Sequence, residues 1–157
     1  KPNQWSCLAT AFAMVLDLTI TEFFSLVGHD GGKIIDPNLP DPVARAGIHP
    51  QEAIDVAWGL GYGVTPIELF PTAITTPGQE PRMVLFPGVL GNWGRFVHHL
   101  NEGRGVIECM GRRCGHAVAF EKGRIYDPDG GEFDYSRGAC EARGLITVRL
   151  WRMERRK

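Results

Sequence analysis

The chain has 157 residues, of which 43% are hydrophobic and 22% are charged, and its formal net charge is -1. This composition is ordinary for a globular protein and excludes a disordered chain, and the length suits one domain over residues 1–157. A net charge so close to zero argues against nucleic acid or an anionic membrane surface as the main partner. We expect the short basic run at residues 149–157 to be solvated.

Hydropathy and cysteine content indicate where such a chain works. No uninterrupted apolar stretch approaches the roughly 20 residues that a membrane-spanning helix needs, and no signal peptide is visible. The four cysteines are too few for a disulfide scaffold at this length. We therefore expect a protein of a reducing compartment, the cytoplasm by default, and the sequence leaves its oligomeric state open.

Helix signals dominate the N-terminal third. Asn3 or Ser6 can cap a first helix whose apolar residues follow helical spacing. The periodicity and the flanking Gly and Pro residues predict three helices here, the first ending near residue 17 and the others over residues 21–27 and 50–60. The Gly-, Asp- and Pro-rich residues 28–42 predict a long loop.

Strand signals dominate the rest of the chain. Two short strands are expected first, over residues 64–69 and 83–86, with a loop rich in Pro, Gly and Thr between them and a helix over residues 92–100 after them. Four more strands are then predicted, over residues 105–110, 116–121, 124–127 and 146–151. Helices first and antiparallel strands later indicate the α+β class.

Cys7 is the candidate nucleophile. It stands at or just inside the N-terminus of the first expected helix, where free backbone N–H groups and the positive end of the helix dipole favour a thiolate. The same N–H groups can stabilise an oxyanion, and the side-chain amide of Gln4 can join them. Because a lone cysteine at a helix start is more often inert and buried, this interpretation depends on a base elsewhere in the chain.

His116 is the candidate base, and a carboxylate follows it on the next strand. A two-residue turn at residues 122–123 predicts a hairpin between these strands. In the register of that turn, Asp127 and Asp129 share parity with His116 and project from the same face of the sheet. Because Pro128 lacks an N–H and ends the strand, Asp127 is the preferred partner and Asp129 is the alternative.

Together these segments resemble the papain-like cysteine peptidases, and within them the compact bacterial branch that includes the double-glycine leader peptidases. The similarity covers about residues 3–17 and 92–130, and its motifs are Gln4-x-x-Cys7, Gly115-His116-Ala117-Val118 and Tyr126-Asp127-Pro128. It implies a papain-like fold in which the nucleophile helix packs on a C-terminal antiparallel sheet. It also implies the roles of the site residues: Cys7 as nucleophile, His116 as base and then acid, Asp127 as orienting group and Gln4 as oxyanion donor. Two features depart from the family, because Gln4 lies closer to the cysteine than the family's glutamine and Leu8 replaces the glycine common after the cysteine.

The resemblance implies a thiol hydrolase that cleaves a peptide or isopeptide bond in a peptide or protein substrate, with no cofactor and no metal. Acyl transfer or deamidation at glutamine, of the transglutaminase type, is an alternative with the same nucleophile and a different acceptor or substrate. A catalytically inactive binding module with this fold is another, although retention of Cys, His and Asp argues against it. A stand-alone enzyme of the sort found in bacteria and phages fits best.

The other cysteines and histidines give weaker signals. Four residues separate Cys109 from Cys114, so the two can bridge a turn or form half of a metal site. No second pair stands at zinc spacing, and we expect free thiols. Residues 129–134 are only superficially similar to a calcium loop and predict a polar turn. The other four histidines are expected on a helix surface or in loops.

Overall fold

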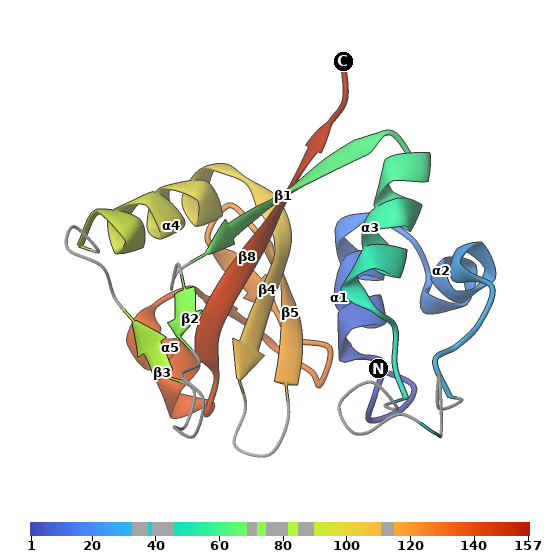
Figure 1. The fold of residues 1–157 in the computed structure, drawn as a ribbon, viewed down its shortest axis with the longest axis horizontal. Coiled ribbons are helices and arrows are strands. Elements are labelled where there is room, and N and C mark those ends of the chain that lie inside the picture. The colour runs from blue at the N-terminus through green and yellow to red at the C-terminus, as the bar shows by residue number, and fades with distance from the viewer. Residues whose placement is uncertain (33–37, 39–45, 69–71, 75–81, 85–89, 111–114) are drawn as a thin grey trace.

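The computed structural model describes residues 1–32, 38, 46–68, 72–74, 82–84, 90–110 and 115–157 (Figure 1). These residues form five helices and eight strands, so the class is α+β as predicted. In chain order the elements are α1 (Cys7–Val15), α2 (Ile20–Val27), α3 (Pro50–Gly59), β1 (Tyr62–Glu68), β2 (Thr72–Ile74), β3 (Arg82–Val84), α4 (Leu90–Glu102), β4 (Arg104–Met110), β5 (Gly115–Glu121), β6 (Arg124–Tyr126), β7 (Glu132–Asp134), α5 (Arg137–Ala142) and β8 (Ile146–Arg155).

One antiparallel sheet organises the described residues. Its six strands follow the order β1-β8-β4-β5-β6-β7, and β2 with β3 forms a separate two-stranded ribbon. Helices α1, α2 and α3 gather on one side of this sheet, and α4 and α5 lie on the other (Figure 1). The central strands β4 and β5 are therefore covered on both faces.

The buried side chains of β4 and β5 divide between two hydrophobic clusters. Val106 belongs to the cluster built with α1, α2 and α3, whereas its neighbour Ile107 belongs to the cluster built with α4 and α5. Successive strand residues point to opposite faces, so both strands are apolar along their length. On the α1 side, Ala117 and Ala119 of β5 meet a helix that is itself rich in buried alanine. Small side chains on both surfaces let α1 pack closely on β5, which brings Cys7 beside the start of that strand.

The hairpin of β5 and β6 has the predicted register. Lys122 and Gly123 both have positive φ, 46° and 82°, which is the geometry of a tight two-residue turn whose twist matches the strands. Glu121 pairs with Arg124, and the pairing continues to Ala119 and Tyr126. The residues after Tyr126 are thereby carried back alongside the beginning of β5, where His116 lies.

Several sequence predictions need correction. Helix α2 begins earlier than residue 21, because Thr19 and Glu22 form a capping box: Glu22 N–H donates to Thr19 Oγ1 over 3.2 Å and Thr19 N–H donates to the Glu22 carboxylate over 2.7 Å. The prediction of a polar turn at residues 129–134 is wrong for its second half, because Glu132–Asp134 forms strand β7, which pairs with β6. Strand β2 and helix α5 were not predicted, since neither shows an apolar period of its own.

The C-terminal basic run is exposed at Arg155, Arg156 and Lys157, as expected, but Arg149 and Arg152 are partly buried within a strand. Strand β8 continues to Arg155 and pairs with β1, where Tyr62 lies opposite Arg155. The guanidinium of Arg156 lies 3.5 Å from the ring centroid of Trp58, so these cations pack on aromatic rings. Most of the loops predicted at residues 28–42 and between residues 69 and 83 lies outside the described residues, as does Cys114.

In the part of the chain that the structure describes, no single helix has the length and apolar character to cross a membrane, and α1 with α2 meets those criteria only as a pair bent by 106°.

Candidate active site

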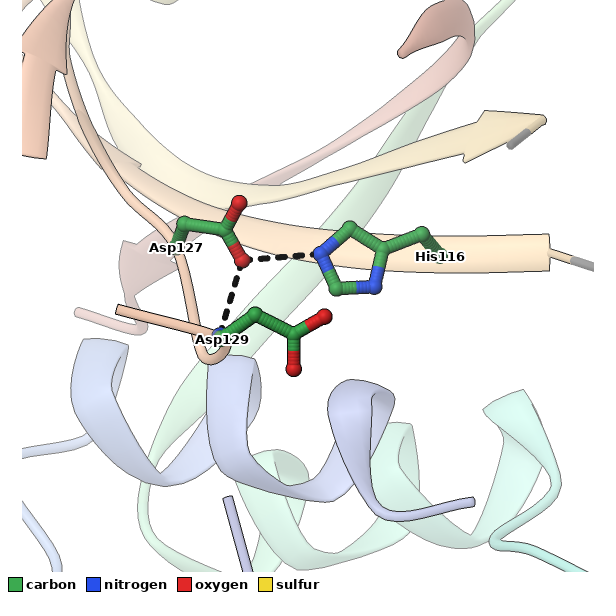
Figure 2. Close-up of side chains that lie close together, drawn as sticks. All are labelled: His116, Asp127 and Asp129. Carbon is green, nitrogen blue, oxygen red and sulfur yellow. Dashed lines mark hydrogen bonds and ion pairs between the residues drawn. The ribbon is translucent and has the colours of Figure 1, made fainter. Parts of the chain in front are cut away.

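His116 and Asp127 form a polar pair at one end of the β5–β6 hairpin. His116 is the second residue of β5, and Asp127 follows the last residue of β6. Their side chains are only 11% and 14% exposed, and His116 Nε2 lies 2.8 Å from Asp127 Oδ1 (Figure 2). The same oxygen accepts a hydrogen bond of 2.9 Å from the backbone N–H of Asp129. Two donors therefore fix the orientation of this carboxylate.

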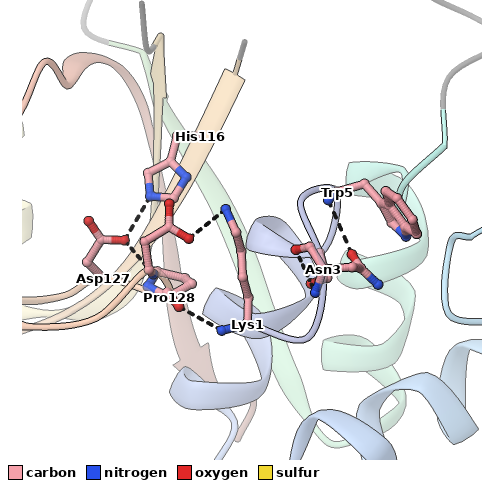
Figure 3. Close-up of polar contacts among 8 residues, drawn as sticks. Lys1, Asn3, Trp5, His116, Asp127 and Pro128 are labelled. Atoms are coloured by element: carbon pink, nitrogen blue, oxygen red, sulfur yellow. Dashed lines mark hydrogen bonds and ion pairs between the residues drawn. The ribbon is translucent and has the colours of Figure 1, made fainter. Parts of the chain in front are cut away.

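Cys7 is the first residue of α1, and a hydrogen-bonded turn positions it. The backbone N–H of Trp5 donates to Asn3 Oδ1 over 3.2 Å, and the Ser6 hydroxyl donates to the Asn3 carbonyl oxygen over 3.1 Å (Figure 3). Ser6 occupies the N-cap position, yet its side chain makes no cap hydrogen bond to α1. The first-turn N–H groups are thus left to interact with negative charge at Cys7.

The Cys7 thiol joins the His116–Asp127 pair. The His116 side chain and the backbone N–H of Ala117 both lie near enough to its sulfur to favour the thiolate and lower the thiol pKa. Because Nε2 of His116 faces Asp127, Nδ1 is the ring nitrogen left for the sulfur. Cys7, which lies more than a hundred positions before the other two residues in the sequence, thus joins one interacting series, Cys7–His116–Asp127. In this series His116 is hydrogen-bonded to Asp127 and interacts electrostatically with Cys7.

The surroundings of these groups favour charge on all three. Burial by itself raises the pKa of the Cys7 thiol, but hydrogen bonding and charge from His116, with the Ala117 N–H and the Lys1 ammonium, outweigh it and lower that pKa. The hydrogen bond to Asp127 and the interaction with Cys7 raise the pKa of His116 to about 9 against the effect of burial. Burial of Asp127 is likewise outweighed by His116 and the Asp129 N–H, so its carboxyl pKa is lowered. At neutral pH this favours a thiolate beside an imidazolium.

The two remaining site predictions have different outcomes. Of the two candidate carboxylates, Asp127 contacts His116, whereas the side chain of Asp129 pairs with Lys1 Nζ at 2.7 Å. Gln4 is exposed in the turn before α1, and its side chain makes no hydrogen bond with any described residue. Its role as oxyanion donor therefore stays a prediction.

A metal ion is the other conceivable occupant of this cluster. Donor atoms of His116, Asp127 and Asp129 lie within 4.8 Å of one another. However, Asp127 already accepts two hydrogen bonds, and the Lys1 ammonium neutralises Asp129. The Lys1 ammonium would repel a metal ion at this position. We therefore interpret the cluster as a hydrogen-bonded group that keeps His116 protonated.

The other histidines and cysteines described below take part in packing, helix capping or ion pairs away from Cys7. The buried thiol of Cys109 lies in the cluster on the α4 side of the sheet, where burial raises its pKa to about 12. His49 lies in the loop before α3, as expected, and caps that helix by accepting from Gln51 N–H over 3.2 Å. His29 Nε2 lies 2.8 Å from the Glu52 carboxylate, and His99 Nδ1 lies 2.6 Å from the Arg152 guanidinium.

Sequence reasoning missed two groups that act on the Cys7 sulfur. Ala117 directly follows His116 in the sequence, so its backbone N–H could have been identified as a group near the sulfur from that adjacency. Lys1 reaches the site only because the chain before α1 lies against Pro128, and no periodicity in the sequence marks that contact.

A half-buried thiol, a base that holds a proton and an oriented carboxylate are together suited to acyl transfer through a thioester. The backbone N–H groups at the start of α1 are placed to stabilise the oxyanion of such a reaction. Comparison of the chain with protein-family models matched no family, and comparison with curated proteins found no significant match.

Proposed function

We propose that this chain is a papain-like cysteine peptidase that hydrolyses a peptide or isopeptide bond through a thioester at Cys7. The observation that carries the proposal is that the hydrogen-bonded His116–Asp127 pair lies beside Cys7, with the thiol pKa lowered and the imidazole pKa raised. A buried thiol without such partners has the opposite shift, as Cys109 has.

Acylation uses the charge-separated pair. The Cys7 thiolate attacks the carbonyl carbon of the scissile amide, and the carbonyl oxygen takes the negative charge near the first-turn N–H groups of α1. When the tetrahedral intermediate collapses, the C–N bond breaks and His116 gives its proton to the leaving amine. Asp127 holds the ring so that the proton-bearing nitrogen stays on the sulfur side.

Deacylation reverses the role of the histidine. Neutral His116 takes a proton from water, and the resulting hydroxide attacks the thioester carbonyl. The C–S bond breaks, the acid product leaves, and the sulfur departs as a thiolate beside the reprotonated imidazole. His116 thus transfers both protons, the one given to the leaving amine and the one taken from water.

The arrangement of elements supports the papain-like part of the proposal. The nucleophile begins a helix that packs on an antiparallel sheet, and that sheet carries the base and its orienting carboxylate in the chain order Cys, His, Asp. A thiolate nucleophile and the further free thiol of Cys109 also suit a reducing compartment such as the cytoplasm.

The test is a degradomic comparison of matched cysteine variants. Purified protein is incubated with a diverse peptide library, and new termini are identified by mass spectrometry. Cys7→Ala should reduce cleavage at least about 10³-fold, whereas Cys109→Ala, which removes a sulfur from the core, should leave it nearly unchanged. A Cys7→Ala protein as active as the parent would discard the proposal.

The same experiment separates hydrolysis from the alternative acceptor chemistry. Deamidation or transfer at glutamine would release ammonia or add a mass to the side chain without creating new termini. Either product, dependent on Cys7, would keep the nucleophile and overturn the assignment as a peptidase.

A further inference from the structure

Lys1 is tied to the segment that follows Asp127 at two points. Its main-chain nitrogen donates to the Pro128 carbonyl oxygen over 2.8 Å, and its ammonium lies 2.7 Å from Asp129 Oδ1 (Figure 3). The Lys1 side chain is 16% exposed, although its partner Asp129 is 53% exposed. So low an exposure is unusual for a lysine side chain, because lysine normally keeps its ammonium group in water.

Asp129 connects this cation to the proposed catalytic series. Its backbone N–H donates to the Asp127 oxygen that also faces His116 Nε2 (Figure 2). Its carboxylate forms the ion pair with Lys1. A single residue thus orients the carboxylate behind the base and anchors a positive charge next to it.

We propose that the Lys1 ammonium, anchored by Asp129, is a charge-stabilising group of this site that favours the thiolate of Cys7, and that Asp129 is its positioning residue. The inference rests on the proposed function, because it concerns the reactivity of the same sulfur. Lys1 would act beside the imidazolium of His116, so that the thiolate faces two cations.

The surrounding charges agree with this role. Burial lowers the pKa of the Lys1 ammonium, but the bond to Asp129 and the negative charges of Asp129, Cys7 and Asp127 outweigh it, so the pKa is raised. Lys1 therefore stays charged wherever the Cys7 thiolate forms. The titratable groups that act on the sulfur are His116 from β5 and Lys1 from the segment before α1, with Asp127 and Asp129 behind them.

The first test measures the alkylation rate of Cys7 with iodoacetamide as a function of pH, by quantitative peptide mass spectrometry. For Lys1→Met we expect the midpoint of the profile to move to higher pH and the rate below the midpoint to fall roughly threefold to tenfold. Lys1→Arg keeps the charge and should restore most of the rate. Lys157→Met removes the same charge from the exposed C-terminus and is the matched control, with thermal unfolding to show that all variants are folded.

The second test uses the charge of the reagent. Iodoacetate is an anion of nearly the same size as iodoacetamide. An ammonium near the sulfur therefore raises the ratio of the iodoacetate rate to the iodoacetamide rate. Lys1→Met should lower that ratio, whereas Lys1→Arg and Lys157→Met should not. A purely structural role for Lys1 would change both rates together.

The positioning role of Asp129 is tested by a double-mutant cycle. If Asp129 holds Lys1 in place, the shift caused by Lys1→Met should be smaller in an Asp129→Asn background than in the parent. Equal shifts in the two backgrounds would overturn this role of Asp129.

Failure of the inference and failure of the proposed function give different results. If Cys7 reacts rapidly and depends on His116, yet Lys1→Met changes neither the midpoint nor the reagent ratio, only the role of Lys1 is wrong. If Cys7 reacts no faster than an ordinary thiol and His116→Ala has no effect, the proposed function itself fails.

Discussion

Cys7 and Cys109 place the same side chain in two different parts of the molecule. Cys7 is half-buried at the start of α1, beside His116, Lys1 and the N–H of Ala117. Cys109 is 3% exposed in β4, within the hydrophobic cluster on the opposite side of the sheet. The thiol pKa is lowered at the first position and raised to about 12 at the second.

The contrast shows that burial alone does not make a cysteine reactive. Desolvation acts on both thiols in the same direction, because it always disfavours the charged form. Of these two thiols, Cys7 has His116, Lys1 and the Ala117 N–H beside it, and together they outweigh burial, whereas the Thr147 side chain does not outweigh the burial of Cys109. A reactive cysteine is therefore recognised by what faces its sulfur.

The largest expected effect is the difference in reactivity between the two thiols. At pH 7 we expect iodoacetamide to modify Cys7 on the order of 10³ times faster than Cys109, because the thiolate of Cys109 is rare and inaccessible. Time-resolved labelling with peptide mass spectrometry measures both sites in one sample. Unfolding in urea should bring the two rates together, and similar rates in the native protein would break the comparison.

Removal of the base should take away most of this difference. In His116→Ala we expect Cys7 alkylation at pH 7 to fall about 10²-fold, since the thiolate loses the cation that contributes most to its lowered pKa. His98→Ala changes an exposed histidine of α4 and serves as the control. An unchanged rate in His116→Ala would mean that the helix terminus alone activates the thiol.

Asp127→Asn should weaken the site less and shift its pH dependence. The carboxylate is the largest cause of the raised pKa of His116, so its loss lowers that pKa from about 9 toward the ordinary 6.5. Hydrolysis by the parent should decline above about pH 9, where the imidazolium loses its proton, and Asp127→Asn should decline at lower pH and be about tenfold slower near pH 8. Asp134→Asn, in β7, is the control.

The same shift has a consequence for stability. Because the folded-state pKa of His116 is raised, the stability contributed by its protonated form is complete below pH 6.5 and is lost as the pH rises through about 9. Thermal unfolding across this range should show a loss in the parent that is smaller in Asp127→Asn. A parent whose stability rises between these pH values relative to the variant would contradict the assigned shift.

The smallest effect on reactivity is expected at Cys109 itself. Cys109→Ala should lower the free energy of unfolding by about 1–2 kcal/mol, because it removes a buried sulfur from a packed core. Cys7 alkylation should stay within about twofold of the parent rate. Chemical denaturation and labelling of the same preparation measure the two quantities, and a large loss of Cys7 reactivity would show that the two regions are coupled.

The sequence predicted well the features that depend on residues close together in the chain. The turn at Lys122-Gly123 has a geometry that fixes the hairpin register, and that register brings Asp127 to His116. The nucleophile helix was likewise visible from its apolar spacing. In both cases neighbouring residues determine the structure, so a single sequence carries the signal.

What the sequence did not predict depends on distant partners. Strand β7 is three residues of mixed polarity, and it is a strand because β6 supplies its hydrogen bonds. Lys1 lies against Pro128, 127 positions away, and that contact arises from how the chain enters α1. Contacts of this kind leave no period or motif in the sequence.

Direct titration of His116 is the sharpest test of the central claim, that an imidazolium and a thiolate share this site. Nuclear magnetic resonance of protein with isotope-labelled histidine would follow the ring in the parent and in Cys7→Ala. We expect the His116 ring to stay protonated through neutral pH, to titrate near pH 9 in the parent, and to titrate lower in Cys7→Ala because the sulfur is gone. A His116 that titrates at or below pH 6.5 in the parent, with no change in Cys7→Ala, would contradict the account.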